Sequence, residues 1–386
     1  MTAQGPGISG LSRPELWSLP AYNAGVPEDV VKRRYQLSRV TRLASNENPL
    51  GPSPQALAAL RNWTEQLHRY PDPACLALRK LLQEHTGVDA GRIAIGNGSE
   101  DIIQSLCLAV LSPGDRVLTP APSFGLHEIF PRMMGAQVEK VRVSTAFTYD
   151  LSAWTTALRT PVKMVMFSTP SNPVGCILNR EELTALVAAA PEDSLLVVDE
   201  AYFEYAQGPD YPDSIAVLAA QARPWMVLRT LSKAYGLAGL RIGYAIASDP
   251  DLVGLLDRVR TPFNINGAAQ AAAMAALLDP GHLQTVVSVC RKQRASLAHA
   301  LGDLEARGHF GLRLAPSHGN FLFLDTARSS SAVAEALMQR GVIAKPWREL
   351  GFDTFLRVTV GTADDSGHFL SALAPSLAAI ATTDAG

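Results

Sequence analysis

Cysteine is scarce in this chain of 386 residues, which contains only Cys75, Cys107, Cys176 and Cys290. No two of them form a CxxC pair, so the spacing does not support a zinc site or a disulfide framework, and we expect reduced core thiols in a cytoplasmic protein without a metal. Long apolar runs are missing as well. The longest, Ala268–Leu278, is interrupted by Gln270 and is too short to cross a bilayer. The N-terminal region lacks the pattern of a signal peptide, and no membrane association is expected.

A dominant charge is absent too. The chain has 34 basic and 36 acidic residues, a formal net charge of −2. This balance gives no support for binding nucleic acid or an anionic membrane surface. Hydrophobic residues make up 47% of the chain and charged residues 18%, a composition that can form a core and argues against disorder. At about 150 residues per domain, the length indicates two or three domains, or one large domain with a smaller partner.

Short β-branched runs alternate with helix-like stretches between about residues 92 and 248. Near-continuous apolar runs are typical of parallel strands covered on both faces, and alternation with helices predicts an open α/β sheet. Asn179, followed by Glu181 and Glu182, indicates the start of one of these helices. The expected strands are Arg92–Ile95, Arg116–Leu118, Gln137–Val143, Lys163–Phe167, Leu195–Val198, Met226–Leu228 and Ile242–Ala247.

The last third of the chain has a different pattern, which predicts a smaller α+β domain. A long helix is expected from about His282 to Arg307, and a final helix near Asp364. Between them we expect strands at Phe321–Leu324, Val342–Ala344 and Phe355–Val360, with a helix at about residues 331–340. The predicted division is an N-terminal arm at 1–54 that contributes to the small domain and to dimer contacts, a large domain at 55–280 and a small C-terminal domain at 281–386.

We expect the catalytic and ligand-binding residues directly after the predicted strands, because ligands of open α/β sheets bind beyond the carboxyl ends of the strands. Residues 96–100 (GNGSE) follow the first strand and open a helix, whose N–H groups could meet a phosphate, although such a turn alone is weak. Asp199 ends an apolar strand, where a carboxylate is costly unless paired or used as a helix cap. Lys233 lies in a loop of small residues, with Ser232 before it and Arg241 eight residues later.

Together these segments resemble the fold-type I pyridoxal-phosphate aminotransferases of class I/II, and within them the histidinol-phosphate aminotransferase family. The resemblance covers nearly the whole chain, and its most specific parts are the lysine loop and the NENPLG segment. It implies a mainly parallel sheet sandwiched by helices in the large domain. The matching segments, in family order, are 43–52 (LASNENPLGP), 70–72 (YPD), 96–100 (GNGSE), 172–173 (NP), 199–202 (DEAY), 230–241 (TLSKAYGLAGLR) and 356–361 (LRVTVG).

The resemblance also implies a cofactor, pyridoxal 5′-phosphate, and roles for the residues around it. Lys233 would bind the cofactor aldehyde and later move the substrate proton as base and acid. Asp199 would keep the pyridine nitrogen protonated, since the pyridinium is the electron sink. Tyr202, the third expected catalytic residue, would hydrogen-bond the phenolic oxygen together with Asn172, and Phe124 would stack on the ring. The other implied cofactor-binding residues are Gly98, Ser99, Glu100, Thr230, Ser232, Arg241 and, from the second subunit of a homodimer with shared active sites, Tyr70.

Four residues are implied at the substrate. Arg357 would receive the α-carboxylate of the amino donor, although an arginine in a β pattern could equally face solvent. Tyr22 would cover the substrate, and Asn46 lies in the matching N-terminal segment. Lys345 stands where the family commonly has an arginine that meets a second anionic group. Lysine keeps the positive charge but lacks the planar guanidinium that binds an anion through two hydrogen bonds. The resemblance therefore implies the reaction more firmly than it implies a phosphorylated substrate.

The function that follows is reversible amino transfer between glutamate and imidazole-acetol phosphate, a step of histidine biosynthesis, with small amino acids and 2-oxo acids as substrates. Two alternatives remain open. One keeps the reaction but changes the acceptor to an aromatic or other 2-oxo acid. The other is a pyridoxal-phosphate decarboxylase of the threonine-phosphate type, which would release CO₂ instead of consuming glutamate.

Overall fold

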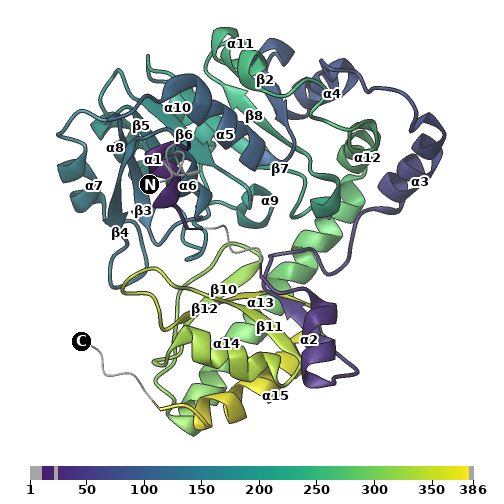
Figure 1. The fold of residues 1–386 in the computed structure, drawn as a ribbon, viewed down its shortest axis with the longest axis vertical. Helices are drawn as coiled ribbons and strands as arrows, with labels where there is room; N and C mark the ends of the chain where they lie inside the picture. Colours follow the sequence, from purple (N-terminus) through teal and green to yellow (C-terminus); the bar gives the residue numbers. More distant parts are fainter. Residues whose placement is uncertain (1–10, 21–24, 382–386) are drawn as a thin grey trace, which may run out of the picture.

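The computed structural model describes residues 11–20 and 25–381, and two β-sheets dominate it (Figure 1). The larger sheet has seven strands in the order β2 (Ile93–Gly96), β8 (Gly243–Ala247), β7 (Trp225–Thr230), β6 (Leu195–Asp199), β5 (Met164–Ser168), β3 (Arg116–Ala121) and β4 (Gln137–Arg142). The smaller sheet has five, in the order β1 (Thr41–Leu43), β11 (Val342–Pro346), β12 (Phe355–Thr359), β10 (Phe321–Asp325) and β9 (Arg313–Leu314).

The seven-stranded sheet is buried between two layers of helices because its central strands are apolar on both faces. Successive side chains of a strand point to opposite faces. Val165 and Phe167 of β5 therefore pack in one hydrophobic cluster, and Met164 and Met166 in another. The helices that pack on the first face include α4 (Leu76–Thr86), α7 (Leu151–Ala157), α8 (Arg180–Ala189), α10 (Ser214–Ala219) and α12 (Gly267–Leu277), and those on the second include α5 (Ser99–Val110) and α11 (Pro250–Val259).

Two strands depart from the expected pattern. β8 runs antiparallel to both of its neighbours, so the prediction of a parallel strand there is wrong. A parallel neighbour needs a crossover, usually a helix, whereas the connection from β7 to β8 contains only the 3₁₀ turn η4 (Ala238–Leu240), and the chain simply reverses. β4 is the other exception, because it is an edge strand in which Gln137, Glu139 and Arg142 are exposed, so helices cover it only in part.

The five-stranded sheet is built from both ends of the chain. β1, from the N-terminal segment, pairs parallel with β11, which places residues 41–43 beside residues 342–344. The long helix α13 (Pro280–Gly308) runs from the larger sheet's side of the molecule down to this sheet, as expected for that stretch (Figure 1). α14 (Ser330–Met338) and α15 (Ala363–Ala378) complete its hydrophobic core. The strands expected near 321, 342 and 355 are confirmed, whereas β1 and β9 were not predicted.

The remaining elements are short or peripheral: α1 (Pro14–Trp17), α2 (Glu28–Tyr35), α3 (Pro54–Trp63), η2 (Thr64–Gln66), η3 (Ala90–Arg92), α6 (Leu126–Met133) and α9 (Phe203–Ala206). Asn179 caps α8 through a reciprocal capping box with Glu182, as its sequence indicates. All four cysteines are buried free thiols, which confirms the expected core role. Within the described part of the chain, no helix is long and apolar enough to span a bilayer.

Candidate active site

The predicted site residues converge where the carboxyl ends of β5, β6 and β7 meet the five-stranded sheet. Asp199 is the last residue of β6, and Thr230 is the last of β7. Arg357 of β12 crosses from the smaller sheet and donates to the Asn172 side chain, 2.7 Å away, in the loop after β5. We call this group of residues, which come from segments far apart in sequence and gather between the two sheets, the cleft.

Lys233 lies in the loop after β7, and its Nζ donates to the carbonyl oxygen of Ser45 at 3.0 Å. Burial, and after it the positive charges of Arg357 and Arg241, lower the pKa of this lysine to about 8, although Glu47 and Asp199 act in the opposite direction. A neutral amine is the nucleophilic form, so this environment favours an amine that can attack a carbonyl near neutral pH.

Asp199 is buried at the end of β6 with both oxygens engaged. Its Oδ1 accepts from the backbone N–H of Ala201 at 3.0 Å, and its Oδ2 lies 3.1 Å from Nε2 of His127. The second ring nitrogen of His127 lies 3.2 Å from the Ser123 hydroxyl. This chain of contacts fixes the carboxylate, since a side chain held on two sides cannot rotate away from the cleft.

The start of α5 lies beside this group of residues, since Arg241, which pairs with Glu100 of α5, is close enough to Lys233 to lower its pKa. Gly98 caps this helix with φ of +83°, and a Cβ there would lie 2.5 Å from Nη2 of Arg241, so only glycine lets the guanidinium approach. Arg241 donates to the Glu100 carboxylate at 2.8 Å and to the carbonyl of Ala238 at 3.0 Å. The helix N-terminus and the guanidinium therefore gather positive potential at one point, a setting that suits a phosphate.

Two hydroxyls lie next to this positive end. The Thr230 hydroxyl donates to that of Ser232 at 2.9 Å, and the same Thr230 oxygen accepts the Ser232 backbone N–H at 3.1 Å. These bonds hold the loop that carries Lys233 in a tight turn at the end of β7. Both residues are buried, as expected of groups that line a binding site rather than the surface.

Arg357 and Lys345 are neighbours on one face of the five-stranded sheet. They form a register pair between β12 and β11, and directly opposite residues in an antiparallel pair project on the same side. Arg357 is 8% exposed, which contradicts the simple solvent-facing alternative, and it also donates to the carbonyl of Ala44 at 2.6 Å. Burial, together with the positive charges of Arg357 and Arg348, lowers the pKa of Lys345 to about 8. Two like charges held this close are unfavourable unless an anion joins them.

Asn46 links the N-terminal segment to this cleft. Its side-chain amide donates to the Tyr202 hydroxyl at 2.9 Å, and its backbone N–H donates to the Thr359 hydroxyl at 2.9 Å. Its backbone oxygen accepts from the Asn320 amide at 2.9 Å. Tyr202 and Asn46 are thus held together in the cleft, with Tyr202 3% and Asn46 0% exposed.

Of the remaining predicted residues, Tyr70 stands apart from this cluster, whereas Phe124 lies at its border. Tyr70 is 84% exposed and stacks on Phe263 with ring centroids 4.6 Å apart. Phe124 is partly buried in the loop after β3 and makes an edge contact with the His127 ring at 5.5 Å. Tyr22 lies outside the described residues.

Sequence reasoning missed His127, Thr359 and Asn320. His127 lies in the first turn of α6, and nothing in its local sequence distinguishes it from any other helix residue. Its position after β3, at the same edge as Asp199, is the signal that could have drawn attention to it. Thr359 follows Arg357 by two residues on β12 and therefore shares its face, a relation that strand alternation could have given.

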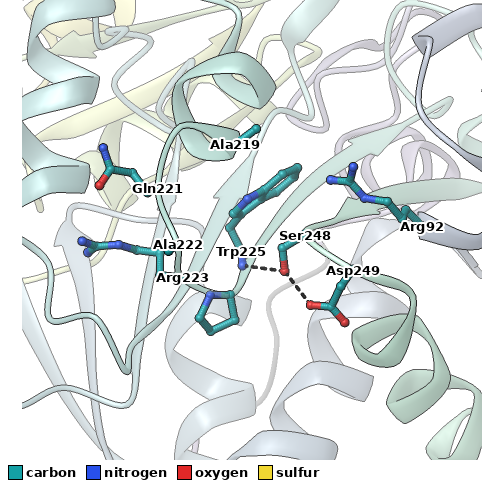
Figure 2. A pocket seen from close by; sticks show the side chains of 9 residues that line it. Arg92, Ala219, Gln221, Ala222, Arg223, Trp225, Ser248 and Asp249 are labelled. Atoms are coloured by element: carbon teal, nitrogen blue, oxygen red, sulfur yellow. Dashed lines mark hydrogen bonds between the residues drawn. The ribbon is translucent and has the colours of Figure 1, made fainter.

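A separate cavity of about 460 Å³ opens at the opposite edge of the seven-stranded sheet. Figure 2 shows Trp225, the first residue of β7, whose backbone N–H donates to the Ser248 hydroxyl. The Ser248 hydroxyl in turn donates to the Asp249 carboxylate. Arg92 and Arg223 also line this cavity, and no predicted site residue does.

Comparison with known proteins identifies the family of the chain. The model of the family described as aminotransferase class I and II matches residues 38–373. The chain therefore belongs to the class I and II aminotransferase family.

Among individual proteins, the chain is 45% identical over 369 residues to histidinol-phosphate aminotransferase 1 of Mesorhizobium japonicum, covering 96% of this chain and 99% of that one. It is 44% identical to histidinol-phosphate aminotransferase 3 of Rhizobium meliloti, covering 94% and 96%. The crystal structure of histidinol-phosphate aminotransferase from Sinorhizobium meliloti, a complex with pyridoxal-5′-phosphate, superposes with a TM-score of 0.85 at 28% identity, covering 95% of this chain and 98% of that one. The expected fold class, a fold-type I α/β architecture, is confirmed.

Proposed function

We propose that this protein is a pyridoxal-phosphate-dependent aminotransferase that transfers the amino group reversibly between glutamate and imidazole-acetol phosphate. The products of the biosynthetic direction are 2-oxoglutarate and histidinol phosphate, formed from glutamate and imidazole-acetol phosphate. The similarity to several histidinol-phosphate aminotransferases over nearly the whole chain supports this substrate pair.

The residues of the cleft suit pyridoxal phosphate. Gly98 leaves room for Arg241 at the N-terminus of α5, and this positive end fits the phosphate group. Asp199 would hold the pyridine nitrogen at the other end, and Phe124 would pack on the ring. When bound, the cofactor supplies an electron sink that stabilises negative charge on the substrate carbon.

Lys233 and its surroundings would carry the proton transfers. The pKa of the Lys233 amine is lowered to about 8, chiefly by burial, so the amine can both bind the cofactor aldehyde and accept the substrate's Cα proton near neutral pH. Asn46 holds the Tyr202 hydroxyl at 2.9 Å, which would orient Tyr202 toward the phenolic oxygen of the cofactor. Asn172 would act on the same oxygen, and Arg357 holds its amide oxygen at 2.7 Å.

The observation that carries the substrate assignment is the register pair of Lys345 and Arg357. In histidinol phosphate, the phosphate ester stands on the carbon that is the carboxyl carbon of an amino acid. A phosphate monoester is close to a dianion at neutral pH, whereas a carboxylate has one negative charge. The adjacent cations Lys345 and Arg357 together match the two charges of the phosphate. The single charge of the α-carboxylate of glutamate needs only Arg357.

A panel of amino donors tests the proposal. We expect purified protein with pyridoxal phosphate to form glutamate from histidinol phosphate and 2-oxoglutarate, with a kcat/KM at least about tenfold above that for phenylalanine, the worth of one charge-assisted interaction. A preference for phenylalanine would instead establish the aromatic aminotransferase. CO₂ release from threonine phosphate without glutamate formation would establish the decarboxylase.

We also propose that the active unit is a cytoplasmic homodimer with shared sites, in which Tyr70 reaches the phosphate of the other subunit. The exposed Tyr70–Phe263 stack and the exposed Leu67 and Leu76 near it support this, since large apolar side chains gathered on a surface mark interfaces. Mixing Lys233→Ala with Tyr70→Phe subunits should restore activity, because one site of the mixed dimer then carries neither change. An active monomer would contradict the proposal.

The same cleft motivates a proposed domain division, with the large domain at 55–280, the small one at 281–386 and the arm at 1–54. Pairing of β1 with β11 supports a contribution of the arm to the small domain. The boundary near 280 coincides with the start of α13 at Pro280. Limited proteolysis that releases a stable fragment cut elsewhere would contradict these bounds.

A further inference from the structure

The loop between β11 and β12 reaches from the five-stranded sheet to the seven-stranded sheet, and Glu349 makes several of the polar contacts of its tip. Glu349 Oε1 accepts from Nζ of Lys140, on β4, at 2.9 Å. Its Oε2 accepts from the backbone N–H of Ser123, in the loop after β3, at 3.3 Å, and from Nε1 of Trp347 at 3.2 Å. One carboxylate therefore joins this loop to two segments of the other sheet.

The Lys140–Glu349 contact is a partly buried ion pair rather than a loose surface contact. The side chains are 26% and 19% exposed, and Lys140 also pairs with Glu128 of α6. Burial acts to lower the pKa of Lys140, but the two glutamates outweigh it and the net pKa is raised, so the lysine is charged at neutral pH. Partial burial makes such a pair stronger than one in full contact with water.

Both ends of this link lead to the proposed active site. On one side, Lys345 precedes Glu349 by four residues and lies on β11. On the other side, the Ser123 hydroxyl lies 3.2 Å from His127, whose other nitrogen contacts Asp199. Phe124, the next residue, belongs to the same loop.

We propose that Glu349 is a positioning residue that holds β11 and β12, which would recognise the substrate, at a fixed distance from the loop after β3, which leads to the cofactor residue Asp199. The inference rests on the proposed function, since the substrate and cofactor roles of these segments are part of it. Other contacts also hold the two sheets together, including the Arg142 side chain on the carbonyl of Leu350 at 3.3 Å and the edge contact of Phe147 with Phe355 at 5.7 Å. Loss of Glu349 should therefore loosen the spacing without unfolding the protein.

If the spacing is looser, a smaller fraction of the molecules is in the conformation that binds the substrate. The apparent affinity for every donor falls in proportion to this fraction. We expect Glu349→Ala to raise KM by up to about tenfold for both histidinol phosphate and glutamate, the worth of one charge-assisted link, with kcat changed less than about twofold. Glu349→Gln, which can still accept the Ser123 N–H, should fall between wild type and Glu349→Ala. Lys140→Met should raise KM in the same way, and the double variant should raise it by less than the two single changes combined, because both break the Lys140–Glu349 link.

Hydrogen exchange of the holoenzyme gives a readout that does not depend on turnover. Exchange in residues 122–126 and 347–352 should become faster in Glu349→Gln. Glu139→Gln is the matched control, since Glu139 lies beside Lys140 on β4 but pairs with Arg116 at 2.6 Å, within the seven-stranded sheet. It should leave both KM and exchange unchanged.

Three results would overturn the proposal: unchanged exchange in both segments, additive effects of Glu349 and Lys140 substitutions, or a KM increase confined to the phosphorylated donor. The last would place Glu349 in the anion site itself. If the wild-type protein transfers no amino group, the proposed function fails, whereas the exchange experiment still decides whether Glu349 links the two segments.

Discussion

Preference for a phosphorylated donor should depend on pH in this enzyme because a lysine, not an arginine, stands opposite Arg357. Burial and the neighbouring charges of Arg357 and Arg348 lower the pKa of Lys345 to about 8. The ammonium form that attracts a phosphate is therefore lost as the pH rises through 8. An arginine stays charged over the whole range.

The size of the effect follows from this titration. With a pKa of about 8, Lys345 is roughly nine-tenths protonated at pH 7 and one-tenth protonated at pH 9. The phosphate itself remains a dianion across this range, because its second pKa is about 6. We expect the ratio of kcat/KM for histidinol phosphate to that for phenylalanine to fall about tenfold from pH 7 to pH 9.

The assay measures both donors with 2-oxoglutarate at several pH values, in wild type and in Lys345→Arg. Taking the ratio of donors removes titrations of the cofactor and of Lys233, which affect both reactions. The ratio should be nearly flat in Lys345→Arg, and the two enzymes should agree best near pH 7. A wild-type ratio that does not change with pH, or one that falls equally in Lys345→Arg, would refute the assignment of Lys345 to the phosphate.

Other consequences are as direct. Gly98→Ala places a Cβ 2.5 Å from Arg241 at a positive φ and should weaken pyridoxal phosphate binding at least about tenfold in equilibrium titration; Gly254→Ala, on α11 with open space around its Cβ position, is the control and should bind normally. Burial raises the pKa of Glu204 from 4.5 to about 7, so the folded state loses stability as the pH rises from about 4.5 to 7, by on the order of 3 kcal/mol. Glu204→Gln should therefore raise the unfolding temperature at pH 8 but not at pH 4.5, and equal shifts at both would contradict the titration. Arg357→Ala should raise the glutamate KM by about 10–100-fold, the cost of one charge-assisted pair, and an unchanged KM would remove Arg357 from the carboxylate site.

Most of the sheet architecture could be predicted from the sequence because its central strands are apolar runs of the right length between helical patterns. The direction of β8 could not, since an antiparallel and a parallel strand buried on both faces have the same composition, and only the connection distinguishes them. β1 was missed for a different reason. Three residues make too short a pattern, and their place in the sheet depends on pairing with β11, some 300 residues later.

The site shows the same division between local and long-range information. Asp199 ends a strand, and Lys233 and Gly98 follow one closely, at the edge where the topology itself brings ligand-binding groups together. The environment of Arg357 is not local: its burial depends on contacts with Asn172 and Ala44, which no β pattern reveals. His127 contacts Asp199 only because β3 and β6 both end at the cleft, so a histidine without any motif became part of the site.

The claim that this cleft holds pyridoxal phosphate on Lys233 has a direct measurement. Holoenzyme treated with borohydride, which makes the covalent link permanent, is digested and analysed by mass spectrometry. We expect the added cofactor mass on the peptide that contains Lys233 and on no other, and none in Lys233→Ala. Cofactor mass on a different lysine, or its persistence in Lys233→Ala, would contradict it.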